Sequence, residues 1–414
     1  MITGLAKVII AVEGGGPTGG AERIAFDTVK LLSKEGIDVT VVSSANVIDP
    51  AYASLKGVEA ICLDLPLHFN RFFAMSKRDM IFNLLEDRQM KTLFKSTLSK
   101  LNSKNTILHA HGFHNCFTQA ILHVANDLEM KTVVTCHDFG ITCPTATLFN
   151  YPQAAICPLE PLSIACLKSD CMGPAAKRLK QLRFARTWAS NKIHHVPQKM
   201  AKVLAVSDHE RDILQRHFGT TVNVETLFNP VDPAATERQF PENSKSYLWI
   251  GRMTEEKDGI TPAKVCQDLE LQLTFVGDGP MRTEIEQSNP TAKFLGWVSS
   301  DKVKNEQCKA RALILSSRWH ETASLVVLEC LAAGIPCVIP NTSAATNWIE
   351  DGFNGLFFEA GNEKSLAQAL KKLGSDEYVE QLSKNAFNRY WNAPFTLDRY
   401  KADLFSYYQE ALRS

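Results

Sequence analysis

The sequence has no long apolar run, no export signal and no net charge. No stretch among its 414 residues approaches the roughly 18 consecutive apolar residues of a membrane-spanning helix. The first apolar run, residues 8–12, is too short for the core of a signal peptide and leads into glycines instead of a cleavage site. Lys plus Arg equals Asp plus Glu, at 45 each, so the overall charge favours neither nucleic acid nor a membrane as partner. We therefore expect a cytoplasmic chain of two or three globular domains that binds no nucleic acid.

The eleven cysteines are odd in number and scattered, which together with the missing export signal predicts reduced thiols. Four of them lie in one loop-rich segment: Cys143, Cys157, Cys166 and Cys171. Four thiolates can hold zinc tetrahedrally, but the segment lacks the C-x-x-C pair that is common in such sites. Zinc and a set of buried free thiols therefore both stay open.

Short apolar runs alternate with amphipathic segments along the whole chain. The predicted strands of the first half are 7–13, 38–44, 59–65, 106–111, 131–138 and 202–208, and those of the second half are 247–251, 272–277, 293–296, 312–316, 336–340 and 355–359. Near-continuous apolar strands between helices are typical of parallel sheets that are covered on both faces. The pattern predicts an α/β protein.

The series of strands and helices occurs twice, on either side of a proline-rich and charged stretch that follows Asn229. We predict two doubly wound domains, residues 1–229 and 230–394. The C-terminal helix, within residues 395–414, is expected to pack back on the first domain. Ligands of such sheets bind beyond the carboxyl ends of the strands, so we expect the site in a cleft between the domains.

The first glycine loop resembles a dinucleotide-binding loop but lacks the acidic residue that such a site requires. Gly14 to Gly19 fits G-x-G-x-x-G, but a dinucleotide site also needs an acidic residue at the end of the second strand, and that strand closes with Ser43-Ser44. This argues against a nicotinamide oxidoreductase. Gly19 and Gly20 precede a helix, where free amides and the helix dipole favour a diphosphate. The alternative is a tight turn that needs positive φ.

Two cations follow the first predicted strand of the second domain, in the segment GRMTEEK. Arg252 can grip a phosphate pair through its fork of donors, and Lys257 can add a point charge. Either residue alone would be interpreted as a solvated surface cation. The next strand ends in a second glycine turn, FVGDGP.

An almost wholly apolar segment, HETASLVVLECLAAGIP, contains two glutamates. Burying an unpaired carboxylate is costly, so such groups are usually paired, neutralised or functional. Ser324 is expected to cap a helix that ends at Gly334, with Glu321 in the loop before it and Glu329 about one and a half turns into it. Glu329 then suits either the adjacent hydroxyls of a ribose or an internal ion pair, for example with Arg252.

With these motifs in order, the sequence resembles the family 4 glycosyltransferases, which have the GT-B fold of two Rossmann-like domains facing across a cleft. The resemblance covers nearly the whole chain. It rests on the two glutamates and on the segments GGAER, VVTCHD, LAVSDHERDIL, NPVD, IGRMTEEK, FVGDGP, FLGWV and DGFNGLFF.

The resemblance implies retaining transfer of a sugar from a UDP- or GDP-sugar, without an obligatory metal or other cofactor. Glu329 would bind the ribose of this co-substrate, and Glu321 would touch the sugar hydroxyls. Arg252 and Lys257 would neutralise the diphosphate. The second domain would therefore bind the nucleotide sugar, and the first domain would be on the acceptor side.

The remaining implied contacts come from backbone amides and one histidine. The amides near Ser324 and Leu325, with Gly19 and Gly20 in the first domain, would complete the diphosphate site. His137, in the family's His-Asp position, would lie near the reacting centre or the acceptor. Departing diphosphate would help to take the acceptor's proton, because Glu321 and Glu329 do not look like the paired carboxylates of a glycosidase.

The sequence departs from the family's pattern at three places. Residues 322–324, Thr-Ala-Ser, replace a glycine-containing stretch, which bears on sugar choice. Asp258 stands where glycine commonly follows the lysine, and Asn347 stands where the family often has glutamate. None of these changes removes a charged donor contact.

Other features leave alternatives open. His109, His111 and His114 resemble metal ligands but lack a carboxylate or cysteine partner nearby, so we interpret them as a strand end at the cleft. The basic segment 177–192 and the segment 69–94 suit anionic lipid at the inner face of a membrane, a lipid-diphosphate acceptor, or ordinary packing.

The sequence therefore predicts a glycosyltransferase that acts on a glycan or lipid-linked acceptor in polysaccharide or glycoconjugate biosynthesis, with peripheral membrane contact as an open question. The alternatives are a sugar-nucleotide epimerase of the same fold and a non-catalytic protein that binds sugar nucleotides.

Overall fold

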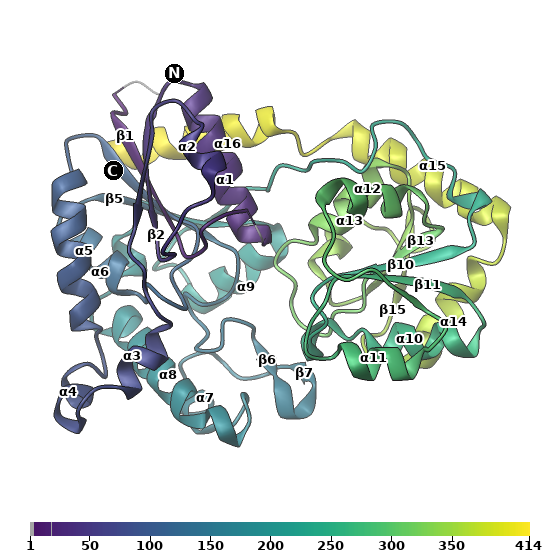
Figure 1. Ribbon diagram of the computed structural model, residues 1–414, viewed down its shortest axis with the longest axis horizontal. Coiled ribbons are helices and arrows are strands. Elements are labelled where there is room, and N and C mark those ends of the chain that lie inside the picture. Colours follow the sequence, from purple (N-terminus) through teal and green to yellow (C-terminus); the bar gives the residue numbers. More distant parts are fainter. Residues whose placement is uncertain (1–3, 18) are drawn as a thin grey trace. The chain divides into compact units, whose positions relative to one another are not determined.

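The computed structural model describes residues 4–17 and 19–414, apart from the side chain of Phe69. Thr18, which belongs to the predicted G-x-G-x-x-G pattern, lies outside the described residues. The chain divides into two units, each with its own sheet (Figure 1). The first unit comprises Met1–Leu148, Pro158–Asn229 and Leu397–Ser414, and the second comprises Phe149–Cys157 and Pro230–Thr396. Within the described residues, no helix combines the length and the apolar character needed to cross a membrane.

The first unit is built on a parallel sheet with the order β3-β2-β1-β4-β5-β8-β9. Its strands are β1 (Lys7–Val12), β2 (Asp38–Ser43), β3 (Val58–Cys62), β4 (Thr106–Ala110), β5 (Lys131–Cys136), β8 (Lys202–Ala205) and β9 (Val224–Thr226). The six predicted strands are confirmed. Strand β9 was not predicted because its three residues are too few to show a pattern.

Strand β1 lies in the middle of this sheet, and Lys7 pairs with Asp38 of β2 and with Thr106 of β4. The strand order progresses away from β1 in both directions, so the direction of winding switches between β1 and β4. Ligands of such sheets bind at this switch point, beyond the carboxyl ends of the strands. The loops that begin at Glu13 and His111 flank it.

The core of the first unit explains the apolar strands. Residues Val8 to Ala11 of β1 are all fully buried, as expected for a central strand covered on both faces. Full burial of one such Val or Ile side chain contributes roughly 1.5–3 kcal/mol. The helices of this unit are α1 (Gly20–Lys34), α2 (Pro50–Ala53), α3 (His68–Phe73), α4 (Lys77–Phe82), α5 (Arg88–Leu101), α6 (Ala120–Asp127), α7 (Ile164–Lys168), α8 (Lys177–Lys192), α9 (Asp208–Phe218) and α16 (Leu397–Arg413).

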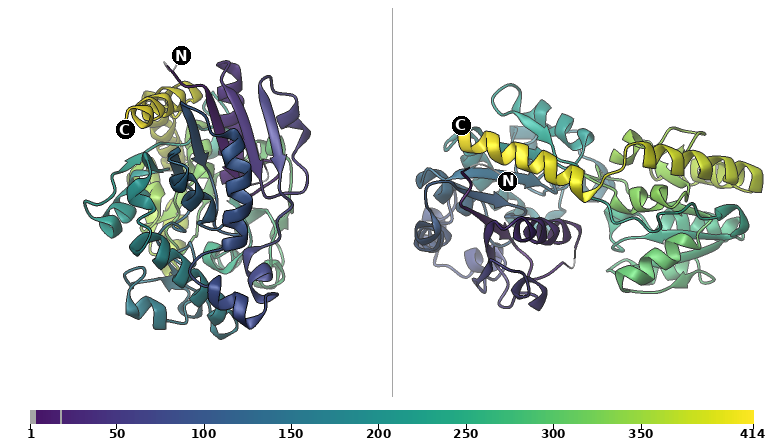
Figure 2. Two further views of the ribbon diagram at one scale, coloured as in Figure 1. Left: turned by 90° about the vertical axis from the view of Figure 1, so that its left-hand side faces the viewer. Right: turned by 90° about the horizontal axis from the view of Figure 1, so that it is seen from above.

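The C-terminal helix α16 belongs to the first unit and is drawn in yellow in Figure 2. Two buried tyrosines anchor it from its inner face. The hydroxyl of Tyr400 lies 2.7 Å from the hydroxyl of Thr28, and the hydroxyl of Tyr408 lies 2.7 Å from Nδ1 of His109. Lys401 adds an ion pair to Glu35 at 2.6 Å.

The second unit contains a parallel sheet with the order β12-β11-β10-β13-β14-β15. Its strands are β10 (Ser246–Ile250), β11 (Gln272–Val276), β12 (Lys293–Phe294), β13 (Ala312–Ile314), β14 (Cys337–Pro340) and β15 (Gly355–Phe358), which confirms the six predictions. The two short strands β6 (Phe149–Asn150) and β7 (Ala155–Ile156) form an antiparallel hairpin that clusters with this unit.

The winding of the second sheet switches between β10 and β13 (Figure 1). The predicted cations and the first glutamate follow these two strands. The helices of the unit are α10 (Ile260–Asp268), α11 (Arg282–Ser288), α12 (Ser300–Cys308), α13 (Leu325–Ala332), α14 (Glu363–Lys372) and α15 (Asp376–Asn392). The α/β class is therefore confirmed, and each sheet places the predicted polar residues at its ligand-binding edge.

Candidate functional site

Close backbone packing fixes the loop that follows β10. The N–H of Met253 donates to the carbonyl of Asp278 at 2.9 Å, and the N–H of Met281 donates to the carbonyl of Met253 at 2.9 Å. A Cβ on Gly277 would lie 1.9 Å from the carbonyl oxygen of Gly251, and its φ of +124° is one that side chains disfavour. The segments GRM and GDGP thus lie backbone against backbone, and this rigid turn carries Arg252.

Arg252 is exposed at the switch point of the second sheet. Among the described residues, its guanidinium makes no side-chain hydrogen bond or ion pair. It does not pair with Glu329, which the sequence had offered as an alternative. An exposed and unpartnered guanidinium on a rigid turn is available to an anion, because no internal carboxylate has to be displaced first.

Lys257 and Glu321 form an ion pair that the sequence did not predict. Glu321 as a residue is 4% exposed, and its carboxylate also accepts hydrogen bonds from the hydroxyls of Ser317 and Ser324, each at 2.8 Å. Burial raises the pKa of Glu321, but the ammonium of Lys257 and the hydroxyl bonds outweigh it and hold the pKa below its ordinary value. The buried carboxylate of the apolar segment is therefore paired.

The ion pair with Glu321 holds the side chain of Lys257 in place. The ammonium of Lys257 also lies 5.2 Å from the centre of the Trp319 ring, so two groups hold it. The side chain of Lys257 is still 23% exposed, which leaves part of the charge open to a ligand. The prediction that Glu321 touches sugar hydroxyls stays a prediction, with both of its oxygens already engaged.

The departure at Asp258 has a structural reason. Asp258 has a φ of +49°, in the left-handed region that favours glycine, and aspartate is one of the few other residues that tolerate it. Its carboxylate accepts Nε of Arg318 at 2.6 Å and the hydroxyl of Thr261 at 2.7 Å. Asp258 therefore combines a strained backbone with side-chain bonds that fix the loop beside Lys257.

Helix α13 begins after Ser324, as predicted, but the serine side chain does not cap it. The hydroxyl donates to Glu321 instead. The N–H of Leu325 donates to the carbonyl of Ala323 at 3.1 Å. Glu329 is half-buried and accepts a hydrogen bond from the amide of Gln307 at 2.9 Å. Its role toward a ribose stays a prediction.

A pocket of about 100 Å³ lies at the switch point of the first sheet. Its polar lining includes Glu13, His111, His114, His137 and Asp138. His137 follows β5, and its Nε2 lies 3.1 Å from Nδ1 of His111, which follows β4. The predicted His137 thus shares this pocket with other titratable side chains, among them Glu13, Glu22 and Asp138, which had not been singled out.

The protonation of this pocket is unusual. Burial lowers the pKa of His137 to about 4, so its imidazole is neutral at neutral pH. Burial raises the pKa of Asp138 to about 6, although its carboxylate accepts the N–H of Gly140 at 2.7 Å. The pocket therefore presents neutral hydrogen-bonding groups and a carboxyl that titrates close to neutral pH.

Glu13 is a structural carboxylate that sequence reasoning missed. It accepts the backbone N–H groups of Asn115 at 2.9 Å, Cys116 at 2.5 Å and Phe117 at 2.8 Å. Burial raises its pKa even so. The available signal was its position as the last residue of the predicted strand 7–13, at the edge where ligands and loops meet. Glu13 fixes the loop that carries His111 and His114.

The other two histidines of the segment HAHGFH do not form the metal-like set. His109 is fully buried and lies 2.8 Å from the hydroxyl of Thr135 and 2.7 Å from that of Tyr408. It is therefore a core residue, which corrects its interpretation as a strand end at the cleft. His114 is also buried, with both ring nitrogens lacking a close hydrogen-bond partner among the described residues.

The first glycine loop has no positive φ among its described glycines, so the interpretation as a left-handed turn is wrong. Close packing requires glycine instead, since a Cβ on Gly15 would lie 2.5 Å from the carbonyl oxygen of Val47. Gly19 precedes α1 with a φ of −124°. A Cβ on Gly20 would meet nothing within 4 Å. The space beside Gly20 is therefore open, but the carboxylate of Glu22 lies against Gly19. The role of this helix start toward a diphosphate stays a prediction.

The four cysteines of the loop-rich segment do not come together as a zinc site. In the described part of the chain, the single group of three or more metal-type ligands within 4.8 Å of one another contains no cysteine. Cys157 clusters with the second unit, whereas Cys143, Cys166 and Cys171 belong to the first. The three cysteines of the first unit are free thiols.

Helix α8 is more deeply packed than its basic sequence indicates. Lys180 is 1% exposed and donates to the carbonyls of Leu167 and Ser169 at 3.2 and 3.1 Å. Arg186 is 4% exposed and pairs with Asp87 at 3.3 Å. These two cations are structural, so only part of the predicted basic face is available to a lipid or an acceptor.

Solved structures share the architecture over the whole chain. The Anabaena protein HepE in complex with UDP and glucose aligns over 97% of this chain and 98% of its own, with a TM-score of 0.65 and 15% sequence identity. That identity shows the fold alone. The predicted GT-B fold, two parallel-sheet α/β domains, is confirmed.

Curated relatives agree in class. The alpha-D-kanosaminyltransferase of Streptomyces kanamyceticus is 24% identical over 224 residues, 48% of this chain and 57% of the relative. The UDP-Gal:alpha-D-GlcNAc-diphosphoundecaprenol alpha-1,3-galactosyltransferase of Escherichia coli is 23% identical over 164 residues, 36% of this chain and 42% of the relative. The chain thus spans about half the length of the curated relatives it matches.

Two family models match in sequence. Residues 233–389 match the model described as glycosyl transferases group 1. Residues 18–235, more than half of the chain, match the model described as Glycosyltransferase Family 4. The chain belongs to glycosyltransferase family 4, which confirms the resemblance.

Proposed function

We propose that the protein is a retaining glycosyltransferase that moves a sugar from a nucleoside-diphosphate sugar to a glycan or lipid-linked acceptor in glycan biosynthesis. The observation that carries the proposal is the pair of cations at the switch point of the second sheet. Arg252 is exposed and unpartnered there, and Lys257 is held beside it on the same loop. This is where the ligand of such a sheet binds.

Sugar transfer requires positive groups that stabilise the departing diphosphate, and this site contains them. Negative charge develops on the diphosphate as the bond to the sugar breaks, and fixed donors aimed at that charge lower the barrier. Arg252 supplies a guanidinium fork, and Lys257 supplies a point charge whose position Glu321 fixes. The start of α13, at Ser324 and Leu325, adds the positive end of a helix. Glu329 is assigned to the ribose.

We assign the acceptor to the first unit, with Gly19 and Gly20 at the start of α1 toward the diphosphate. His137 hydrogen-bonds at the reacting centre as a neutral imidazole, since burial holds its pKa near 4. Glu321 is engaged by Lys257, Ser317 and Ser324 and is therefore a poor nucleophile. This supports front-face transfer, with the leaving diphosphate taking the acceptor's proton and the anomeric configuration retained.

A lipid-linked acceptor is supported by the surface around α4. Ile81 is 73% exposed and Phe82 is 51% exposed, with Lys77 and Arg78 on the same short helix. Apolar side chains beside cations suit the surface of an anionic membrane. Flotation of the protein with vesicles of anionic lipid, and its loss in Ile81→Ser, would support peripheral contact. Equal flotation of the variant would exclude α4 as the contact.

The donor assignment is tested with UDP- and GDP-sugars on the purified chain. We expect one nucleotide sugar to raise the melting temperature and to be turned over when an acceptor is supplied. Arg252→Ala should lower kcat/KM about 100- to 1000-fold, the range for loss of one donor to a developing anion. Arg389→Ala is the matched control, because Arg389 lies in the same unit but pairs with Glu350 at 3.0 Å.

Three results would contradict the proposal. Unchanged kcat/KM in Arg252→Ala would remove the diphosphate contact. Unchanged turnover in His137→Ala would remove the histidine from the reaction. Release of free nucleotide without any acceptor, together with an inverted sugar stereocentre, would favour the epimerase. Nuclear magnetic resonance of the product's anomeric proton decides between retention and inversion.

A further inference from the structure

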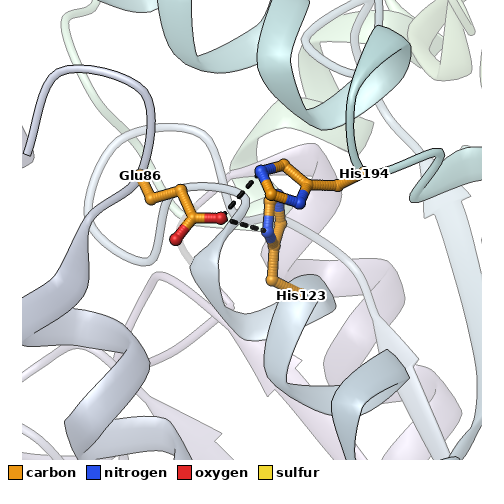
Figure 3. A group of neighbouring side chains, drawn as sticks. All are labelled: Glu86, His123 and His194. Carbon is orange, nitrogen blue, oxygen red and sulfur yellow. Dashed lines mark ion pairs between the residues drawn. The ribbon is translucent and has the colours of Figure 1, made fainter.

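Three metal-type side chains from separate segments of the first unit converge, as Figure 3 shows. Glu86 precedes α5, His123 lies on α6 and His194 follows α8. Oε1 of Glu86 lies 2.7 Å from Nε2 of His194 and 3.8 Å from Nδ1 of His123. One ligand atom of each residue lies within 4.8 Å of the other two. No second group of this kind exists in residues 4–17 and 19–414.

We propose that Glu86, His123 and His194 bind a divalent transition-metal cation, with Zn²⁺ as the best match, and that water completes the coordination. Two imidazoles and one carboxylate form a recurrent zinc ligand set. Imidazole nitrogen also selects transition metals over Mg²⁺ and Ca²⁺, which prefer oxygen. The proposal is independent of the proposed function, because none of the three residues lines the pocket of His137.

The geometry is close to what a tetrahedral ion requires. Bonds of about 2.0–2.2 Å separate neighbouring ligand atoms by about 3.3–3.6 Å. The two separations from Oε1 of Glu86, 2.7 and 3.8 Å, lie on either side of that range. The imidazole planes of His123 and His194 are inclined by 58° with ring centres 4.6 Å apart, so the rings do not block each other. Two of the three separations between ligand atoms are therefore close to those around a bound ion.

The charges around the group also favour a cation. Oε2 of Glu86 lies 3.4 Å from the ammonium of Lys91, which in turn lies 3.6 Å from Asp127. Two carboxylates against one ammonium give the acidic and basic side chains around the imidazoles a net charge of −1. Two imidazoles and a carboxylate in a locally acidic environment suit a divalent transition-metal cation.

Binding would join three parts of the first unit. The loop between α4 and α5 would be tied to α6 and to the end of α8. The next residue, Asp87, already pairs with Arg71 and Arg186, each at 3.3 Å. A metal on Glu86 would extend this network and stabilise the folded state, because the site does not exist in the unfolded chain.

The test is zinc binding by the purified full chain after removal of metal. We expect one Zn²⁺ per chain by elemental analysis and a higher melting temperature when Zn²⁺ is added. His194→Ala and Glu86→Gln should each weaken Zn²⁺ affinity by more than the roughly 10- to 100-fold that follows loss of a ligand-orienting partner. Glu86→Gln keeps the shape of the side chain, so it guards against an unfolded variant. Co²⁺ in place of Zn²⁺ should give visible bands without the intense near-ultraviolet absorption of thiolate ligands.

Two controls separate this site from other sources of zinc binding. His195→Ala removes an exposed histidine that is adjacent in sequence but outside the group, and it should bind Zn²⁺ like the parent chain. Cys166→Ser should also bind normally. Absence of Zn²⁺ uptake by the parent chain would overturn the proposal. Unchanged uptake by His194→Ala and Glu86→Gln, or uptake that depends on Cys166, would overturn it as well.

Discussion

Replacement of Lys257 by methionine should lower the free energy of unfolding, and the loss should be larger at pH 7 than at pH 5. The change keeps most of the apolar stem but leaves the carboxylate of Glu321 buried without its cation, with 6% of its side chain exposed. Removing one partner of a buried pair commonly costs about 3–5 kcal/mol. Protonation of Glu321 sets a ceiling on that cost, because the variant can fold with a neutral carboxyl.

The ceiling follows from the ordinary pKa of glutamate, about 4.3, and from 1.36 kcal/mol per pH unit. It is about 3.7 kcal/mol at pH 7 and about 1 kcal/mol at pH 5. In the parent chain the folded pKa of Glu321 is lowered, so its stabilisation is present above the unfolded pKa and is lost as pH falls through the folded pKa. In Lys257→Met burial raises the folded pKa, so stability is lost as pH rises. The stabilisation lost from the parent is similar at both pH values, so the protonation penalty makes the total loss up to about 2.7 kcal/mol larger at pH 7 than at pH 5.

Tryptophan fluorescence during urea unfolding is a suitable assay, because a two-unit chain need not unfold in one step. Five of the six tryptophans lie in the second unit: Trp249, Trp297, Trp319, Trp348 and Trp391. Their signal thus reports chiefly on the unit that contains the ion pair.

A double-mutant cycle and one control complete this experiment. The variant Lys257→Met/Glu321→Gln should recover most of the loss, with a coupling energy of about 2 kcal/mol. Lys264→Met is the control, because its pair with Glu363 is 50% exposed on both sides and should contribute almost nothing at either pH. An equal penalty at pH 5 and pH 7, or strictly additive single changes, would refute the reasoning.

Two further predictions concern Asp258, in the loop after β10, and Asp138, in the loop after β5. At Asp258, whose φ is +49°, Asp258→Ala should destabilise the second unit by about 1 kcal/mol more than Asp258→Gly, since both lose the bond to Arg318 but only alanine is strained. Equal losses in urea would show that the backbone is relaxed. Asp138 has its pKa raised to about 6, so its folded state loses stability as pH rises through 6, and Asp138→Asn should stabilise the first unit at pH 8 by up to about 3 kcal/mol. A lower melting temperature of this variant at pH 8 would contradict the assignment.

Local patterns predicted the elements of this fold but not the contacts between them. All twelve predicted strands are present, because a run of buried apolar residues is visible in the sequence itself. The pair of Lys257 and Glu321 spans 64 residues, and the bond between Glu13 and Asn115 spans 102. Such pairs depend on which strands become neighbours, and the sequence alone left that order open. The apolar segment around Glu321 showed that its carboxylate needed a partner without showing which one.

The glycines show the same limit at shorter range. The turn after β1 looked like a left-handed turn or a dinucleotide loop, but Gly15 is required by the carbonyl of Val47, which follows β2. Position 277 must be glycine because a Cβ there would clash with the carbonyl oxygen of Gly251. In both cases the neighbouring loop decides why glycine is present, so spacing within one loop cannot separate a phosphate site from close packing.

The two switch points differ in charge although their strand orders are alike, and this difference supports the division of labour between the units. The loop after β10 presents the cations Arg252 and Lys257. Around the first pocket, burial keeps His137 neutral, and no lysine or arginine is among the described lining residues. A diphosphate gains from fixed positive charge, whereas an uncharged hydroxyl acceptor gains from neutral hydrogen-bonding groups that do not have to be desolvated as ions. If the roles were reversed, a doubly charged donor would face a pocket with no free cation among its described lining residues, and the unpartnered Arg252 would have no function.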